Sequence, residues 1–259
     1  MSNQQNCKII VYWLEKSRAQ RIVWLLEELN LEYELKIYKR GSDKLAPKEL
    51  KDIHPLGKSP LISIQPEGAE KPIVLAESGV IIEYLAEHFG KRLIPDRYPE
   101  GKDGGVGAET DAWLRYRYLL HYSEGSFMPV LIICIVVDGI RNAPVPFFLK
   151  PITGGIANKV YSVFINPELK NHLSFLENYL ATAPGGGSYF CGPSITAADI
   201  QLSFVLEGAV SHGCLTESAY PKLYSYVRRF QDTESYKRAG QRIESATGEK
   251  FVPFSEVKF

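Results

Sequence analysis

The chain has 259 residues, a length typical of two domains or one large one. Its 45% hydrophobic and 12% aromatic content is that of a folded protein and excludes a disordered or fibrous one. The 30 lysines and arginines balance 30 aspartates and glutamates. The chain therefore lacks the excess positive charge on which nucleic-acid binding depends, and we expect no nucleic-acid partner.

Cysteines, histidines and apolar runs exclude several further classes of protein. The four cysteines and five histidines show no metal-binding spacing, so we expect reduced thiols, no metal ion and a cytoplasmic protein. The apolar run at residues 9–14 is too short for a signal peptide. The longest apolar run, residues 128–137, is about half as long as a transmembrane helix, which predicts a buried helix and no transmembrane segment.

The pattern of apolar residues in the first ninety positions predicts a small mixed domain. In chain order it predicts a strand, a helix, a strand, a β-hairpin and a helix, at residues 8–13, 18–29, 33–39, 61–64 with 73–75, and 78–89. Strands that alternate with helices in this way are typical of a sheet covered by helices.

The composition changes after Pro95, because prolines and glycines crowd residues 95–107. We therefore expect one domain over residues 1–92, a linker over 93–108 and a second domain over 109–259. Helical periodicity dominates the second domain and predicts that it is all α, with helices at residues 110–122, 169–181, 197–210 and 223–230. Proline- and glycine-rich stretches at 142–155 and 184–193 are predicted to interrupt the helices.

The loop His54-Pro55-Leu56-Gly57-Lys58-Ser59-Pro60 runs directly into a predicted strand. A cis Ser59-Pro60 bond would expose the backbone N–H and C=O of Ser59 to a ligand, because proline cannot donate to a strand ladder. The alternative is an ordinary trans loop proline, since cis accounts for only about 5% of X-Pro bonds.

Glu77 and Ser78 open the helix that follows the hairpin. Ser78 can cap the first turn, where unpaired N–H groups suit a carboxylate, and Glu77 can accept a hydrogen bond from an ammonium group. The pair therefore fits the two charges of an amino acid. A plain helix cap is the alternative.

Ser17 lies at the first junction of strand and helix, beside the positive end of the helix. Such a position lowers the pKa of a thiol. A fall from about 8.5 to about 6.5 would raise the thiolate fraction at pH 7 from about 3% to about 75%. The alternative is again a helix cap, without a catalytic role.

Four motifs in this order resemble the cytosolic glutathione transferase superfamily, in particular the fungal and bacterial group whose first helix begins W-L-x-x-S-R-x-x-R. The matching residues are Trp13, Leu14, Ser17, Arg18 and Arg21, then the HPLGKSP loop with Pro60, then Ala76-Glu77-Ser78, then Ser194-Ile195-Thr196-Ala197-Ala198-Asp199. The last motif is a capping box, in which Thr196 caps a helix and Asp199 reaches back to it.

The resemblance implies an α+β two-domain protein, with an N-terminal thioredoxin-like β-α-β-α-β-β-α domain and a C-terminal all-helical domain. It implies a homodimeric glutathione transferase that takes glutathione as co-substrate, needs no cofactor and acts on a small hydrophobic electrophile. Peroxidase activity is a candidate side activity. Carried over by motif, the glutathione-binding residues are Lys58, Ser59, Pro60, Glu77 and Ser78. The cation for the glycyl carboxylate is left open among Lys39, Arg40 and Lys44.

One position departs from the family pattern, because Leu14 stands where related classes carry a hydroxyl or thiol. Ser17 is the predicted catalytic residue, and Tyr12 is the alternative if the strand ends early. No cysteine lies between Trp13 and Arg21, so a cysteine-based mechanism is not expected. The missing hydroxyl also supports an alternative function, a non-catalytic glutathione-binding or regulatory protein of the same fold.

The second-substrate site is predicted at Leu14 and at the aromatic residues Tyr118 and Tyr122, on the helix at 111–122. The resemblance places this helix beside the second substrate. Semi-exposed packing of the two tyrosines is the alternative.

Overall fold

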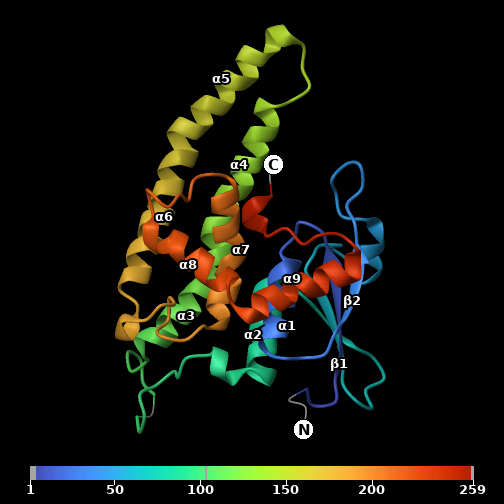
Figure 1. Ribbon diagram of the computed structural model, residues 1–259, viewed down its shortest axis with the longest axis vertical. Coiled ribbons are helices and arrows are strands. Elements are labelled where there is room, and N and C mark those ends of the chain that lie inside the picture. Colours follow the sequence, from blue (N-terminus) through green and yellow to red (C-terminus); the bar gives the residue numbers. More distant parts are fainter. Residues whose placement is uncertain (1–3, 103, 258–259) are drawn as a thin grey trace.

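The computed structural model describes residues 4–102 and 104–257, and Figure 1 shows a sheet-containing part beside a helical part. The first part contains β1 (Lys8–Leu14), α1 (Ala19–Glu28), β2 (Glu34–Tyr38), β3 (Leu61–Gln65), β4 (Ile73–Ala76) and α2 (Ser78–Phe89). The strand order is β2-β1-β3-β4. The pair β1 and β2 is parallel, and the pairs β1 and β3 and β3 and β4 are antiparallel. This is the thioredoxin-like arrangement, with a 3₁₀ turn at Lys48–Asp52 where the second α of the expected order would lie.

Among its described residues, the regular structure of the second part is helical, apart from one isolated β-bridge between Tyr189 and Gly192. Its helices are α3 (Asp111–Tyr122), α4 (Met128–Arg141), α5 (Lys150–Val160), α6 (Asn166–Ala181), α7 (Ala197–Ser211), α8 (Pro221–Gln231) and α9 (Glu234–Thr247). Single π-helical turns join α3 to α4 and α5 to α6. The fold class is confirmed. The division at residues 93–108 stays a prediction.

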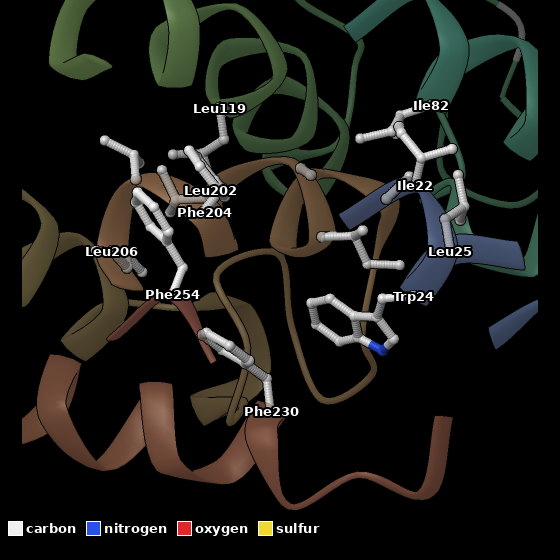
Figure 2. Close-up of a cluster of buried hydrophobic side chains, with 14 of the residues drawn as sticks. Ile22, Trp24, Leu25, Ile82, Leu119, Leu202, Phe204, Leu206, Phe230 and Phe254 are labelled. Atoms are coloured by element: carbon white, nitrogen blue, oxygen red, sulfur yellow. The ribbon is translucent and has the colours of Figure 1, made fainter. Parts of the chain in front are cut away.

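One continuous core joins the two parts, because α1 packs against both α7 and α9. Figure 2 shows Trp24 of α1 facing the helical part, where its ring stacks on Phe230 with centroids 5.4 Å apart. The Trp24 indole N–H donates to the Ser235 hydroxyl at 3.0 Å, which satisfies its polar atom inside the core. Packing between α1 and the helical part therefore sets the relative position of the two parts.

The capping box at the start of α7 is confirmed. The Asp199 carboxylate accepts from the Thr196 backbone N–H at 2.8 Å and from the Thr196 hydroxyl at 2.6 Å. It also accepts from the Tyr226 hydroxyl at 2.7 Å and the Phe190 N–H at 3.2 Å. Asp199 therefore ties α7 to α8 and to the loop before α7, beyond the local cap.

The structure corrects two expectations about the helices, at residues 142–155 and 128–137, and adds one helix that the sequence did not predict. The stretch 142–155 contains the start of α5, because Pro151 lies in the first turn, where a missing N–H costs nothing. The polar segment that forms α9 was not predicted as a helix, although Tyr236, Ala239 and Ile243 form its buried face.

The run at 128–137 does form a helix, but only one of its faces is buried. Ile132, Ile135 and Val136 are exposed. The helical stretch Asp111–Arg141 is long and apolar enough to cross a membrane, judged by length and composition only. Here α4 packs against α5 and α7, as a helix at the edge of a protein core does. The hairpin of α4 and α5 projects away from the sheet in Figure 1.

Candidate functional site

A cavity of about 680 Å³ lies between the sheet-containing part and the helical part. Its N-terminal wall comes from the loops after β1 and β2 and the loop before β3, with Leu14, Glu15, Lys16, Ser17, Arg18, Arg40, Gly41, Lys44, Leu45, Ala46, Lys58 and Ser59. Its opposite wall comes from α4, α7 and the C-terminal segment, with Met128, Leu131, Ile132, Ile135, Phe204, Gly208, His212, Phe254 and Val257. One wall is thus polar and cationic, and the other is almost entirely apolar.

Ser17 lies in the polar wall, just before α1. Its hydroxyl donates to the backbone oxygen of Leu14 at 2.7 Å and accepts from the Ala19 N–H at 3.1 Å. It therefore caps the helix through Ala19, while Arg18 is the residue at the helix boundary. To donate to a ligand in the cavity, the hydroxyl proton must turn away from Leu14, since a serine has one donor.

Ser59 lies next to Ser17 in the same wall of the cavity, with the two hydroxyl oxygens 3.2 Å apart. The Ser59-Pro60 peptide bond is cis, as predicted. Among the described residues, the backbone N–H and C=O of Ser59 make no hydrogen bond, so both are available to a ligand. Lys58 beside it is exposed and lines the same cavity, and Pro60 is buried directly before β3.

The cavity's polar wall carries five cationic side chains, Lys16, Arg18, Arg40, Lys44 and Lys58, and one carboxylate, Glu15. Of the three cations left open by the sequence, Arg40 and Lys44 belong to this wall. Lys39 pairs with Glu249 instead and does not line the cavity. The polar wall is therefore suited to an anionic ligand.

Glu77 and Ser78 lie at the start of α2 and are linked to α1 through Arg21. The Ser78 hydroxyl accepts from the guanidinium of Arg21, which also donates to the backbone oxygen of Gln201 and pairs with Glu124. Burial lowers the pKa of Arg21 to about 10, against the opposite effect of Glu124. Glu77 is exposed and has a φ of 67°, in the left-handed region that non-glycine residues rarely adopt. Because Arg21 follows Ser17 by about one helical turn, the start of α2 lies next to the start of α1.

The structure does not bring Tyr12 to the cavity. Strand β1 continues through Leu14, so the strand does not end early. The ring of Tyr12 is buried against Leu50 and Leu61, and its hydroxyl lies 3.2 Å from the Ser63 hydroxyl. Tyr12 was expected to reach the ligand only if the first strand ended early, and the strand does not.

Tyr118 and Tyr122 also lie outside this cavity. They border a separate shallow hollow with Arg117 and His121, and their rings stack on one another with centroids 5.3 Å apart. The hydroxyl of Tyr122 lies 2.6 Å from Nδ1 of His172. The third residue predicted for the second substrate, Leu14, does line the cavity.

Sequence reasoning missed the apolar wall. Four of its members, Met128, Leu131, Ile132 and Ile135, follow the i, i+3, i+4, i+7 spacing of one helical face. That spacing is a signal that the sequence contained, although the run was interpreted as wholly buried. Phe254 and Val257 reach the cavity from the C-terminal segment, where Phe254 stacks on Phe204 with centroids 4.1 Å apart.

None of the cysteines lines the cavity, and all four are free thiols. Burial raises the pKa of Cys134 to about 11 and that of Cys214 to about 12, so both are protonated at neutral pH. Within residues 4–102 and 104–257 there is no group of three or more histidine, cysteine or carboxylate side chains that could hold a metal ion. The groups that the cavity offers to a ligand are therefore hydroxyls, cations and apolar side chains.

Comparison with known proteins identifies relatives over nearly the whole chain. Residues 17–88 match the family described as "Glutathione S-transferase, N-terminal domain", and residues 153–238 match "Glutathione S-transferase, C-terminal domain". Glutathione S-transferase 1 of Saccharomyces cerevisiae is 33% identical over 243 residues, which are 94% of this chain and 98% of that protein.

Two solved structures share the fold. A glutathione S-transferase from Actinobacillus pleuropneumoniae is 28% identical, with 96% of each chain covered and a TM-score of 0.65. A glutathione transferase homologue from Lodderomyces elongisporus, solved with two GSH per subunit, is 19% identical over 90% of this chain and 97% of that one, with a TM-score of 0.66. At that identity the second likeness concerns the fold alone.

Proposed function

The chain belongs to the glutathione S-transferase family, and from this premise we propose that it adds the thiolate of glutathione to hydrophobic electrophiles bound in the cavity described above. The observation that carries the proposal is the composition of that single cavity, in which a cationic wall with two serines faces an apolar wall. The cationic wall can thus bind an anionic peptide thiol, and the apolar wall beside it can bind an apolar electrophile. Holding both converts a bimolecular reaction into a local one.

The cationic wall accounts for binding of glutathione. The tripeptide carries two carboxylates, one ammonium group and, once activated, a thiolate. It is attracted by Lys16, Arg40, Lys44 and Lys58, with Glu15 as the opposing carboxylate, whereas Arg18 is paired with Glu124 at 2.9 Å. We propose Arg40 or Lys44 for the glycyl carboxylate, because both line the cavity and Lys39 does not. Lys58 adds positive charge beside the peptide, and Pro60 holds the loop that presents Ser59.

The remaining contacts follow the chain of glutathione from one end to the other. We assign the free backbone N–H and C=O of Ser59 to the cysteinyl unit, which they can pair with as a neighbouring strand would. Glu77 and Ser78 receive the γ-glutamyl end, where Ser78 is already oriented by Arg21. The peptide then spans from the start of α2 to the start of α1.

Thiolate activation falls to Ser17 and to the start of α1. The first N–H groups of the helix and its dipole favour negative charge at this point. A hydrogen bond from the Ser17 hydroxyl would add a further preference for the thiolate, in exchange for its bond to the backbone oxygen of Leu14. The proton of the thiol leaves to solvent, and the sulfur attacks an electrophile held against α4.

An alternative function, glutathione binding without catalysis, is favoured by two observations. Leu14 occupies the position where related classes have a hydroxyl, and the Ser17 proton is directed to a backbone oxygen. The two functions differ in turnover, which we would measure with glutathione and a chlorodinitrobenzene, and with glutathione and cumene hydroperoxide for peroxidase activity. Saturable turnover supports the transferase. Tight glutathione binding without turnover of either substrate supports the alternative.

A matched pair of lysine variants tests the binding assignment. Lys44→Ala removes a cation of the cavity wall, and Lys39→Ala removes one outside it. We expect calorimetry to show weaker glutathione binding for Lys44→Ala only. Equal losses in both variants would mean that net charge, and not the cavity wall, attracts the ligand. We further propose that the protein is a cytoplasmic homodimer. Sedimentation analysis of the purified chain tests the dimer, and fractionation of cells that express the protein tests the location.

A further inference from the structure

One polar side chain interrupts the apolar wall of the cavity. Of the nine cavity-lining residues contributed by α4, α7 and the C-terminal segment, eight are apolar or glycine, and the ninth is His212 at the end of α7. An imidazole has two hydrogen-bonding nitrogens. These nitrogens do not contribute to the binding of a purely apolar ligand.

His212 is held from behind by two residues of other elements. Its Nε2 lies 3.1 Å from the Asp138 carboxylate of α4 and 3.0 Å from the Tyr161 hydroxyl of the turn between α5 and α6. The Tyr161 hydroxyl donates its own proton to Asp138 at 2.8 Å. Since that proton is already placed, Nε2 must carry a hydrogen to be attracted by both oxygens.

This arrangement leaves Nδ1 as the free nitrogen of the ring. Among the described residues, Nδ1 of His212 makes no hydrogen bond, while the ring is 18% exposed and borders the cavity. The ring of Tyr161 lies nearly parallel to it, with centroids 6.2 Å apart and an interplanar angle of 20°. The imidazole is thus oriented by its partners and has one unused nitrogen. An orienting carboxylate behind a histidine is a common way to fix which nitrogen faces a ligand.

We propose that His212 binds the carbonyl oxygen of an α,β-unsaturated carbonyl electrophile through Nδ1 and stabilises the charge that forms there. This rests on the proposed transferase function and names the substrate class of the same cavity. Asp138 and Tyr161 are positioning residues, because they act only through the imidazole. Donation from Nδ1 uses the form of the ring that carries a hydrogen on both nitrogens, and the Asp138 carboxylate 3.1 Å from Nε2 balances the charge of that form.

The addition balances without any further reactant. The glutathione sulfur forms a bond to the β-carbon, and the carbon–carbon π pair shifts toward the carbonyl oxygen. Nδ1–H of His212 donates to the resulting enolate and gives it a proton, and the ring regains one from water, which received the thiol proton. A donor aimed at the oxygen where charge develops lowers the barrier of this step. Displacement of a halide produces no such oxygen and gains nothing from it.

Isosteric replacements of His212 separate this role from a structural one. His212→Gln places an amide nitrogen near the position of Nε2 and so keeps the contact with Asp138 while removing Nδ1. His212→Asn places an amide nitrogen near Nδ1 and loses the contact behind. The readout is the ratio of kcat/KM for benzylideneacetone to that for benzyl chloride, which both carry a phenyl ring but differ in the carbonyl group.

We expect His212→Gln to lower this ratio at least about tenfold, as the loss of one hydrogen bond to a charged group does, and His212→Asn to retain most of it. Tyr161→Phe should give an intermediate loss that lies mainly in KM for the enone and leaves kcat closer to that of the parent, because the orientation of the ring, and not the donor, is impaired. An unchanged ratio in His212→Gln, or equal losses for Gln and Asn, would overturn the proposal.

A binding measurement on the parent protein keeps the test independent of whether the variants fold. The glutathione conjugate of benzylideneacetone should bind more tightly by calorimetry than the same conjugate with a methylene in place of the carbonyl. Equal affinities contradict the role of His212. Absence of turnover with both electrophiles, together with a clear preference for the carbonyl conjugate, would instead contradict the proposed transferase function alone.

Discussion

The hydroxyl oxygens of Ser17 and Ser59 lie 3.2 Å apart, although 42 positions separate the two residues in the sequence. One comes from the start of α1 and the other from the loop that ends in the cis Ser59-Pro60 bond. A sulfur atom bound beside this pair would be within reach of both hydroxyls. Which of the two donates to it decides how the thiolate is stabilised.

If Ser17 is the donor, Ser17→Ala removes one hydrogen bond to a charged sulfur, worth about 1.5 to 3 kcal/mol, or one to two pKa units. We expect the pKa of bound glutathione to rise by about that amount, with residual activity from the helix start. The measurement is the ultraviolet absorbance of the bound thiolate against pH. Ser59→Ala is the matched control, and a shift in that variant alone would assign the hydrogen bond to Ser59.

Tyr12→Phe should leave the thiolate titration where it is in the parent. The Tyr12 hydroxyl lies 3.2 Å from the Ser63 hydroxyl, and Tyr12 does not line the cavity. Removal of this hydroxyl therefore affects the stability of the core and not the ligand site. Because Ser63 is buried and loses a partner, we expect unfolding to require about 1 kcal/mol less free energy. Chemical denaturation measures this change. A displaced titration would show that the Tyr12 hydroxyl reaches the ligand in another conformation of the protein.

Glu77→Gln should weaken glutathione binding at least about tenfold, since it removes a charge-assisted hydrogen bond to the ammonium group. Glu77 is exposed, and its side chain makes no hydrogen bond or ion pair among the described residues, so the melting temperature should not change. Ser78→Ala is the contrasting variant. It deprives buried Arg21 of a partner, so both affinity and melting temperature should fall. Unchanged affinity in Glu77→Gln would remove this residue from the binding site.

The features that could be predicted from the sequence are those whose cause lies within a few residues. The capping box of Thr196 and Asp199 and the strand pattern of residues 8–13 each follow from local chemistry. Part of the candidate site shares this property. Ser17 and Ser59 stand at junctions between elements, where backbone groups are unpaired, and both do line the cavity.

The features that could not be predicted depend on packing between distant segments. Leu14 and Val257 line the same cavity although they lie near opposite ends of the chain. No local sequence pattern predicts that two such distant residues come together. Tyr118 and Tyr122 lie outside the cavity, because their face of α3 packs against Phe175 and His172. Which face of a helix meets a cavity is decided by the tertiary fold and not by its own periodicity.

Asp199→Ala should cost at least about 3 kcal/mol of unfolding free energy, because several buried donors lose their acceptor and each costs about 1 to 3 kcal/mol. A capping box alone is worth about 0.5 to 2 kcal/mol, but this carboxylate also serves Tyr226 and Phe190. Denaturant titration measures the loss. Asp199→Asn keeps one acceptor oxygen and should lie between parent and alanine variant. Glutathione affinity at low temperature should be unaffected, and a specific loss of affinity would reveal a functional role.

The last prediction concerns Glu207, a fully buried carboxyl group of α7. It accepts hydrogen bonds from the Tyr236 hydroxyl, from Gln231 at 2.8 Å and from Gln20 at 3.1 Å. Burial raises its pKa from 4.5 to about 7, and the three donors offset only part of this effect. Glu207 thus joins α1 to α7 and α9 and is half-protonated near neutral pH.

A folded-state pKa above the unfolded one means that the folded protein holds a proton which the unfolded chain has already released. Between pH 4.5 and about 7 the free energy of unfolding therefore falls as the pH rises, by on the order of 3 kcal/mol in all. Glu207→Gln has no proton to lose and should be flatter across this window than the parent. Glu217→Gln, an exposed surface change, should keep the slope of the parent. Denaturant titrations at pH 5 and pH 8 measure it. If all three proteins share one slope, Glu207 is ionised in the folded state, and its three donors outweigh the cost of burial.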